Sequence, residues 1–83
     1  MEKDVAITIL EDIQEALQGE NARIDALETL DIYIKELEAM TSKKIKNLFN
    51  KQKYYIRKYG EYARKIAKIN KKIDKEIRKV YNS

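Results

Sequence analysis

The sequence contains no cysteine, proline, histidine or tryptophan, and only two of its 83 residues are glycine. Without cysteine and histidine the chain has no disulfide bonds, no Cys/His zinc sites, no thiol nucleophile and no imidazole for acid–base catalysis. The scarcity of glycine and proline argues against all-β folds, which need frequent turns. These absences together predict an all-α protein.

Charged residues are abundant and make up 39% of the chain, compared with roughly a quarter in typical globular proteins. The net charge of +4 conceals two opposed halves. Residues 1–40 contain eleven acidic and three basic residues, a net charge of −8, whereas residues 41–83 contain three acidic and fifteen basic residues, a net charge of +12. Such asymmetry indicates either a basic arm that meets an anionic partner or two halves that neutralise each other on folding.

No apolar run approaches the roughly 20 residues that a membrane-spanning helix needs. The N-terminal region carries Glu2 and Asp4 where a secretory signal would have basic residues. We therefore expect a cytoplasmic protein with no membrane span. The length allows one small domain, so we expect residues 1–83 to form a single helical domain.

The acidic half contains two amphipathic segments. Apolar residues recur at three- and four-residue spacing in residues 4–18 and again in residues 22–40, which predicts two helices. Gly19 is expected to end the first helix in the left-handed conformation, and Asn21 to cap the second. So short a connection predicts an antiparallel hairpin. The expected core stripe of the second helix consists of Ile24, Leu27, Leu30, Ile34 and Leu37.

Residues 43–81 have the most regular pattern in the chain. Mostly apolar residues occupy the a, d and e positions of consecutive heptads from Ile45, with Gln52, Asn70 and Glu76 as the polar members, which predicts a long basic amphipathic helix of about 58 Å. The short hairpin cannot cover that length, so we expect a homodimer in which a second chain buries the distal half. The expected interface of this dimeric helical bundle consists of Ile56, Tyr59, Ala63, Ile66, Ile69, Ile73, Ile77 and Val80.

Two joints leave alternatives open. Thr41 and Ser42 are good N-cap residues, but the lysines that follow would lie at the positive end of a new helix. The segments 22–40 and 43–81 are therefore either separate helices or one continuous rod. Gly60 costs about 1 kcal/mol in a helix interior, yet the apolar stripe keeps its phase across it. We expect a continuous helix that is weak at Gly60, whereas a true break would give a four-helix bundle.

The basic residues of segment 43–79 are the strongest functional signal, because all of them fall outside the apolar stripe. Phosphate backbones bind such surfaces through counterion release, without sequence readout. Tyr54 also falls outside the stripe and is suited to stacking on a base, whereas Tyr55, Tyr59 and Tyr62 lie on the stripe, which is typical of packing. The candidate nucleic-acid-binding residues are Lys43, Lys44, Lys51, Lys53, Tyr54, Arg57, Lys58, Arg64, Lys65, Lys68 and Lys72.

The sequence contains no recognisable catalytic or cofactor-binding motif. Neither glycine has a partner glycine for a phosphate-binding loop, and no histidine is present to activate a serine or threonine. Glu11 and Glu15 lie one helical turn apart, but the Glu-x-x-His motif of di-metal bundles is absent, so a solvated acidic face is the better interpretation. We expect a non-enzymatic protein with no cofactor and no metal.

Two functions fit these patterns. The first is binding of nucleic acid, largely without sequence specificity, through the cationic side of segment 43–79. The alternative is a protein-interaction module, such as an inhibitor, immunity protein, adaptor or assembly factor of phage, viral or plasmid type. In that case the separated charges form the interface with an acidic protein partner or with a second copy. No motif singles out one protein family.

Overall fold

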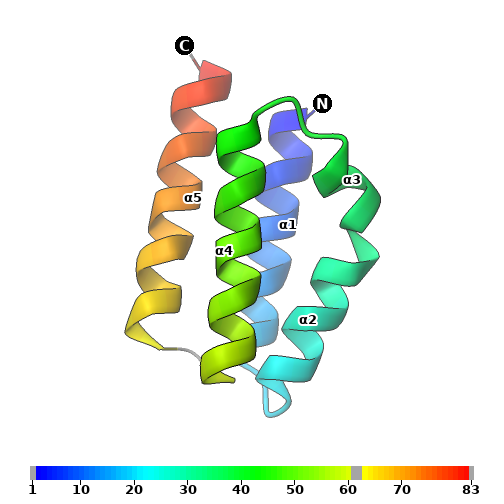
Figure 1. The fold of residues 1–83 in the computed structure, drawn as a ribbon, viewed down its shortest axis with the longest axis vertical. Coiled ribbons are helices and arrows are strands. Elements are labelled where there is room, and N and C mark those ends of the chain that lie inside the picture. Colours follow the sequence, from blue (N-terminus) through cyan, green and yellow to red (C-terminus); the bar gives the residue numbers. More distant parts are fainter. Residues whose placement is uncertain (1, 61–62, 83) are drawn as a thin grey trace.

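The computed structural model describes residues 2–60 and 63–82, and these residues form helices and connections without any strand. The predicted all-α class is thereby confirmed. The α2 and α3 segments follow each other as one bent arm, so the helices make four arms with short connections. In chain order the helices are α1 (Glu2–Leu17), α2 (Ala22–Ile32), α3 (Ile34–Glu38), α4 (Lys43–Tyr59) and α5 (Arg64–Asn82) (Figure 1).

The four arms run antiparallel to their neighbours and form a closed ring. Both α1 and α4 contact α2 and α5, so that α1 lies diagonally across from α4 (Figure 1). Lys44 near the start of α4 pairs with Glu76 near the end of α5, while Tyr55 near the end of α4 lies beside Lys65 near the start of α5. The architecture is therefore an up-down-up-down four-helix bundle, with overall dimensions of 36 × 24 × 17 Å.

The core lies between the four arms and consists mainly of aliphatic side chains. Each arm contributes residues at helical spacing, because only one side of each helix faces its neighbours. Full burial of one such side chain stabilises the fold by about 1.5–3 kcal/mol. The most buried apolar residues are Ala6, Ile9, Leu10, Ile13, Leu17, Ala26, Leu30, Ile45, Phe49, Ile56, Ile66, Ile69, Ile73 and Ile77.

Residues 43–81 do not form one helix, and that prediction is wrong. The helix α4 ends at Tyr59, and Gly60 follows it as a C-cap with a φ of 73°. The Gly60 N–H donates a hydrogen bond to the carbonyl oxygen of Ile56 at 2.8 Å, and α5 then returns antiparallel to α4. Glycine adopts this left-handed conformation without the steric cost that other residues incur. The four-helix alternative is therefore the observed arrangement.

The residues expected to form a dimer interface are instead mostly buried within one chain. Tyr59 and Ala63 are partly buried against the core, and Val80 is 37% exposed. Because α5 packs on α1 and α4 of its own chain, the length argument for a second chain no longer holds. Tyr62, which was also expected on the stripe, lies outside the described residues. The interface candidates that are at most 3% exposed in the single chain are Ile56, Ile66, Ile69, Ile73 and Ile77.

The predicted helix 22–40 is interrupted at Tyr33, which separates α2 from α3 with φ and ψ of −94° and 14°. The Tyr33 hydroxyl donates a hydrogen bond to Asp12 Oδ2 of α1 at 2.7 Å. The expected stripe is wrong at Ile24 and Ile34, which are 59% and 44% exposed. The buried side of α2 is formed instead by Ala22, Ala26 and Leu30.

The end of α1 also differs from expectation, since Gly19 does not have a positive φ and Asn21 makes no side-chain cap.

The helical structure breaks at Thr41 and Ser42, before α4, so α3 and α4 are separate helices. The Ser42 side chain accepts a hydrogen bond from the N–H of Ile45 at 3.2 Å. The Glu2 carboxylate accepts one from the N–H of Thr41 at 2.7 Å. These acceptors satisfy N–H groups immediately before and at the start of α4.

Candidate nucleic-acid interface

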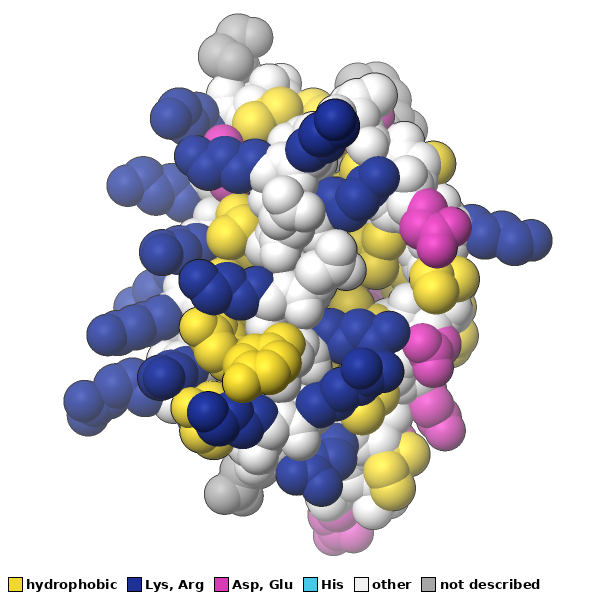
Figure 2. All heavy atoms as spheres, viewed as in Figure 1, with side chains coloured by type: hydrophobic (Ala, Val, Ile, Leu, Met, Phe, Trp, Pro, Cys, Tyr) yellow, Lys and Arg dark blue, Asp and Glu magenta, His cyan; other side chains and the backbone are white. Residues whose placement is uncertain are grey.

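The hairpin of α4 and α5 presents a broad basic surface, which we call the cationic face. It comprises the outward sides of α4 and α5 with the fifteen lysines and arginines that lie between residues 43 and 79. Thirteen of these residues are exposed, and Lys46 and Lys53 are partly buried. Figure 2 shows the basic side chains spread over α4 and α5, with acidic side chains gathered along the α2 side. The hairpin thus places these basic residues on two adjacent helices. In one continuous helix they would be spread over about twice the length.

The acidic half of the chain neutralises little of the cationic face. Only three ion pairs join carboxylates to it within the described part of the chain. These are Lys44–Glu76 at 3.4 Å, Lys53–Asp31 at 3.7 Å and Arg78–Asp74 at 3.1 Å. Lys46 donates instead to the backbone oxygen of Glu38 at 2.8 Å. The other basic residues of α4 and α5 have no ion pair with a described carboxylate.

A groove runs between α4 and α5 and consists of two adjoining clefts. Lys72 lines both of them, so the two clefts adjoin at this residue. The first cleft, of about 210 Å³, is lined by Lys51, Tyr55, Lys65, Lys68, Ile69 and Lys72. The second, of about 350 Å³, is lined by Lys44, Leu48, Lys72, Lys75, Glu76 and Lys79.

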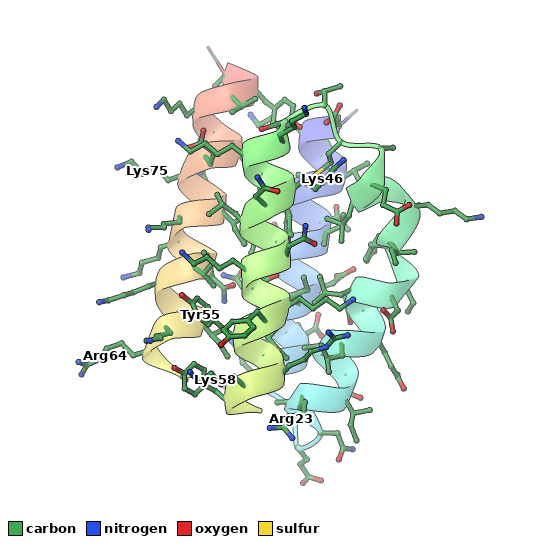
Figure 3. The ribbon with its side chains drawn as sticks, viewed as in Figure 1. Arg23, Lys46, Tyr55, Lys58, Arg64 and Lys75 are labelled. Carbon is green, nitrogen blue, oxygen red and sulfur yellow. The ribbon has the colours of Figure 1, made fainter. Side chains whose placement is uncertain are left out.

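Three tyrosines form a cluster in the last turns of α4, at the end of the groove. The ring centroids of Tyr54 and Tyr55 are 5.7 Å apart, and those of Tyr55 and Tyr59 are 6.2 Å apart. Lys58 Nζ lies 5.9 Å from the Tyr54 ring and 5.7 Å from the Tyr59 ring, while Lys65 Nζ lies 5.9 Å from the Tyr55 ring. Figure 3 shows Tyr55 over the gap between α4 and α5, with Lys58 below it and Arg64 projecting outward from α5. Aromatic rings and cations therefore alternate at this end of the face.

The structure brings some of the predicted binding residues together and separates others. Lys51 of α4 meets the α5 lysines Lys65, Lys68 and Lys72 around the first cleft. Lys53, by contrast, turns toward α2 and its ion pair with Asp31. Lys44 is exposed and lines the second cleft. The remaining candidates are also exposed and are Lys43, Tyr54, Arg57, Lys58 and Arg64.

The predicted binding residues leave out five basic residues of the cationic face, although the sequence places all five outside the apolar stripe. The five are Lys46, Lys71, Lys75, Arg78 and Lys79. The prediction also leaves out Arg23 of α2. Lys75 and Lys79 line the second cleft, and their heptad spacing from Lys68 and Lys72 is a signal that predicts the same side of α5. Arg23 of α2 lies against the C-cap of α4, with a terminal guanidinium nitrogen 2.6 Å from where a Cβ on Gly60 would be. No sequence signal points to Arg23, because its position depends on the turn at Gly60.

Among the described residues, no group of three acidic side chains is placed to hold a metal ion. No helix in the described ranges is long and apolar enough to cross a membrane. Comparison with known protein families, curated proteins and solved structures finds no match for this chain.

Proposed function

We propose that this protein binds nucleic acid, largely without sequence specificity, through the cationic face of α4 and α5. The observation that carries the proposal is the density of basic side chains on the hairpin with no described carboxylate beside most of them. A phosphate backbone releases condensed counterions when it meets such a surface, which drives binding.

The residue types on the face support binding without base readout. Reading of base edges in the major groove favours arginine, asparagine and glutamine. Lysine dominates the cationic face, and Gln52 and Asn70, which lie on the same two helices, are at most 1% exposed. The twelve lysines between residues 43 and 79 outnumber the exposed arginines and asparagines of these helices. The exposed side chains that could reach a base edge include Arg57, Arg64 and Arg78, with Asn47 and Asn50 of α4.

The first test is a titration of labelled DNA and RNA oligonucleotides, single- and double-stranded, followed by fluorescence anisotropy. Between about 50 and 300 mM NaCl we expect log K to fall linearly with log salt, with a slope of about −4 for five phosphate contacts. The absence of binding to every oligonucleotide at the lowest salt concentration would overturn the proposal.

A charge reversal localises the binding surface. Lys51→Glu, Lys68→Glu and Lys72→Glu together remove three cations from the first cleft, and we expect the salt slope to become shallower by about 2 to 3. A matched pair of single variants compares Lys68→Glu with Lys35→Glu, because both lysines are exposed on helices and only Lys68 lies on the cationic face. Equal loss of binding in this pair would place the site elsewhere.

A protein-interaction module is the second candidate, and a different surface favours it. Ile24, Ile32 and Ile34 on α2 and α3 are 59%, 73% and 44% exposed, beside exposed carboxylates such as Glu28 and Asp31. Exposed apolar side chains with a charged rim are typical of protein contact sites. The surface on α2 and α3 is acidic and the cationic face is basic. The simplest partner of the acidic surface is therefore the cationic face of a second copy of this chain. Light scattering that shows a monomer at low salt would rule out that self-association.

A further inference from the structure

We infer that the cationic face takes single-stranded rather than double-stranded nucleic acid, with a base stacked on Tyr54 and the phosphates held by lysines of the α4–α5 groove. This inference rests on the proposed function and specifies its ligand. The reason is that the face combines phosphate-binding cations with an exposed aromatic ring, and a duplex keeps the faces of its bases hidden in its own stack.

Tyr54 is the aromatic residue that the fold leaves available. It is 57% exposed, whereas Phe49 is 1% exposed, and Tyr55 and Tyr59 are partly buried against the core. Tyr54 is absent from the core cluster and contacts the neighbouring Tyr55 ring and Lys58. An exposed tyrosine ring amid lysines has no evident packing role, but it matches the stacking platforms that bind single strands.

Two lysines lie next to the rings of the tyrosine cluster. Lys58 Nζ is within 6 Å of both the Tyr54 and the Tyr59 ring, and Lys65 Nζ is equally close to Tyr55. A base stacked on Tyr54 would carry its phosphate past Lys58. The lysine would exchange a weak cation–π contact for a charge-assisted hydrogen bond to the phosphate.

The adjoining cleft combines a small volume with an apolar and a basic lining. Its volume of about 210 Å³ is small, below the roughly 300–1,000 Å³ of sites for drug-sized ligands. Tyr55 and Ile69 give it apolar lining, and its four lysines supply the charge. One planar ring can enter such a cleft while the backbone follows the lysines along the groove. A rigid duplex can touch the lysines with its phosphates but cannot place a base inside.

The test separates the contribution of the ring from that of the charge. Single-stranded oligothymidylate of about 20 nucleotides, an abasic oligonucleotide of equal charge and a duplex of equal length are titrated against the wild type, Tyr54→Leu and Tyr54→Phe. We expect oligothymidylate to bind between about fivefold and a hundredfold more tightly than the abasic strand. Tyr54→Leu should remove most of that preference, while Tyr54→Phe keeps it and duplex binding stays the same in all three proteins.

A direct readout of stacking is available because the chain has no tryptophan. Tyr54→Trp introduces a single indole, whose fluorescence should be quenched by oligothymidylate and not by the abasic strand. Helical circular dichroism of each variant checks that the bundle is intact.

The outcomes distinguish this inference from the proposed function. If the abasic strand binds as tightly as oligothymidylate, or if Tyr54→Leu binds as the wild type does, the inference is wrong and charge-driven nucleic-acid binding stands. If no oligonucleotide binds even at low salt, the proposed function fails and the inference fails with it.

Discussion

Glu2 joins three parts of the chain that are distant in sequence. Its carboxylate accepts hydrogen bonds from the Thr41 N–H before α4 and from the Tyr81 hydroxyl in α5, at 2.7 and 2.8 Å. The Thr41 N–H, followed by the Tyr81 hydroxyl, holds the pKa of Glu2 below its ordinary value of 4.5. Burial, together with the bond to Glu2, raises the pKa of Tyr81 to about 12. The folded state therefore favours the ionised carboxylate and the neutral phenol.

The contribution of Glu2 to stability should depend on pH. Because folding lowers its pKa, the contribution is present above pH 4.5 and is lost as the pH falls through the folded value. We expect Glu2→Gln to lower the free energy of unfolding by about 0.5 kcal/mol at neutral pH, because the amide accepts these hydrogen bonds without the charge. The solvent screens most of the charge effect at this partly exposed site. Urea unfolding followed by circular dichroism should show this difference shrinking as the pH falls below 4.5. Glu15→Gln, an exposed change on the same helix, is the control. An effect of Glu2→Gln that is independent of pH would contradict the assignment.

Gln52 and Asn70 show that a periodic pattern can locate buried polar residues as well as apolar ones. Both occupy the heptad stripe, and both are buried between α4 and α5, where Gln52 Nε2 donates a hydrogen bond to Asn70 Oδ1. Gln52 Oε1 and Asn70 Nδ2 have no partner within the described residues. A buried pair of this kind favours one alignment of two helices, because a shift of either helix would leave both amides unpaired.

Gly60 decides the fold at the scale of the elements, and its substitution is therefore informative. Gly60→Ala would place a Cβ at a φ of 73° and within 3 Å of the Arg23 guanidinium. We expect it to lower the free energy of unfolding by about 1–2 kcal/mol, the cost of the left-handed conformation for a residue with a side chain. The measurement is urea unfolding, with light scattering to detect any association of chains.

Gly19→Ala is the matched control for Gly60→Ala. Gly19 does not have a positive φ, and a Cβ there would lie 3.4 Å from the carbonyl oxygen of Ala16, close to ordinary contact distance. Its effect should stay within about 0.5 kcal/mol. Equal destabilisation by the two substitutions would mean that the left-handed turn is not what makes Gly60 necessary.

Periodicity predicts the buried side of α5 but cannot predict where the chain reverses. Ile66, Ile69, Ile73 and Ile77 all lie on the predicted stripe and in the core. The stripe continues in phase on both sides of Gly60, because each arm of a tight hairpin turns its own apolar side toward the same core. Phase alone therefore cannot separate a rod from a hairpin. The groove of the candidate site depends on that reversal. The lysines can therefore be identified from the sequence, but the sequence does not show that lysines of α4 and α5 line the same groove.

The acidic arm is a harder case for sequence reasoning. Helical spacing allows two alternative apolar sides on α2, one through Ile24 and one through Ala22 and Ala26. The structure buries the alanines, which lets α2 lie close to its neighbours, and leaves Ile24 exposed. The Tyr33 hydroxyl bonds to Asp12 at the bend between α2 and α3. No proline or glycine lies near Tyr33, so the sequence gives no signal for this bend. Only the packing of the whole bundle selects between these sides.

At the scale of the whole molecule, the charge of the two halves stays separated. The ion pair Lys53–Asp31 crosses from α4 to α2, but the lysines around the first cleft face one another without a described carboxylate between them. Like charges at such positions repel, and salt screens the repulsion over a Debye length of about 10 Å at 0.1 M. We therefore infer that the cationic face reduces the stability of the free protein, which a bound polyanion would restore.

Charge reversal on this face should stabilise the free protein while it weakens binding. We expect Lys68→Glu to raise the free energy of unfolding by about 0.5 kcal/mol at low salt, because it replaces a repulsive neighbour of Lys51, Lys65 and Lys72 with an attractive one. The gain should disappear at about 0.5 M salt. Lys53→Glu is the contrasting variant, since it breaks the pair with Asp31 and should destabilise the fold at low salt. Urea unfolding at both salt concentrations measures these effects. If Lys68→Glu and Lys53→Glu lower the free energy of unfolding equally, the lysines of the cationic face stabilise the fold. That result would contradict the inference that they destabilise the free protein and serve an anionic ligand.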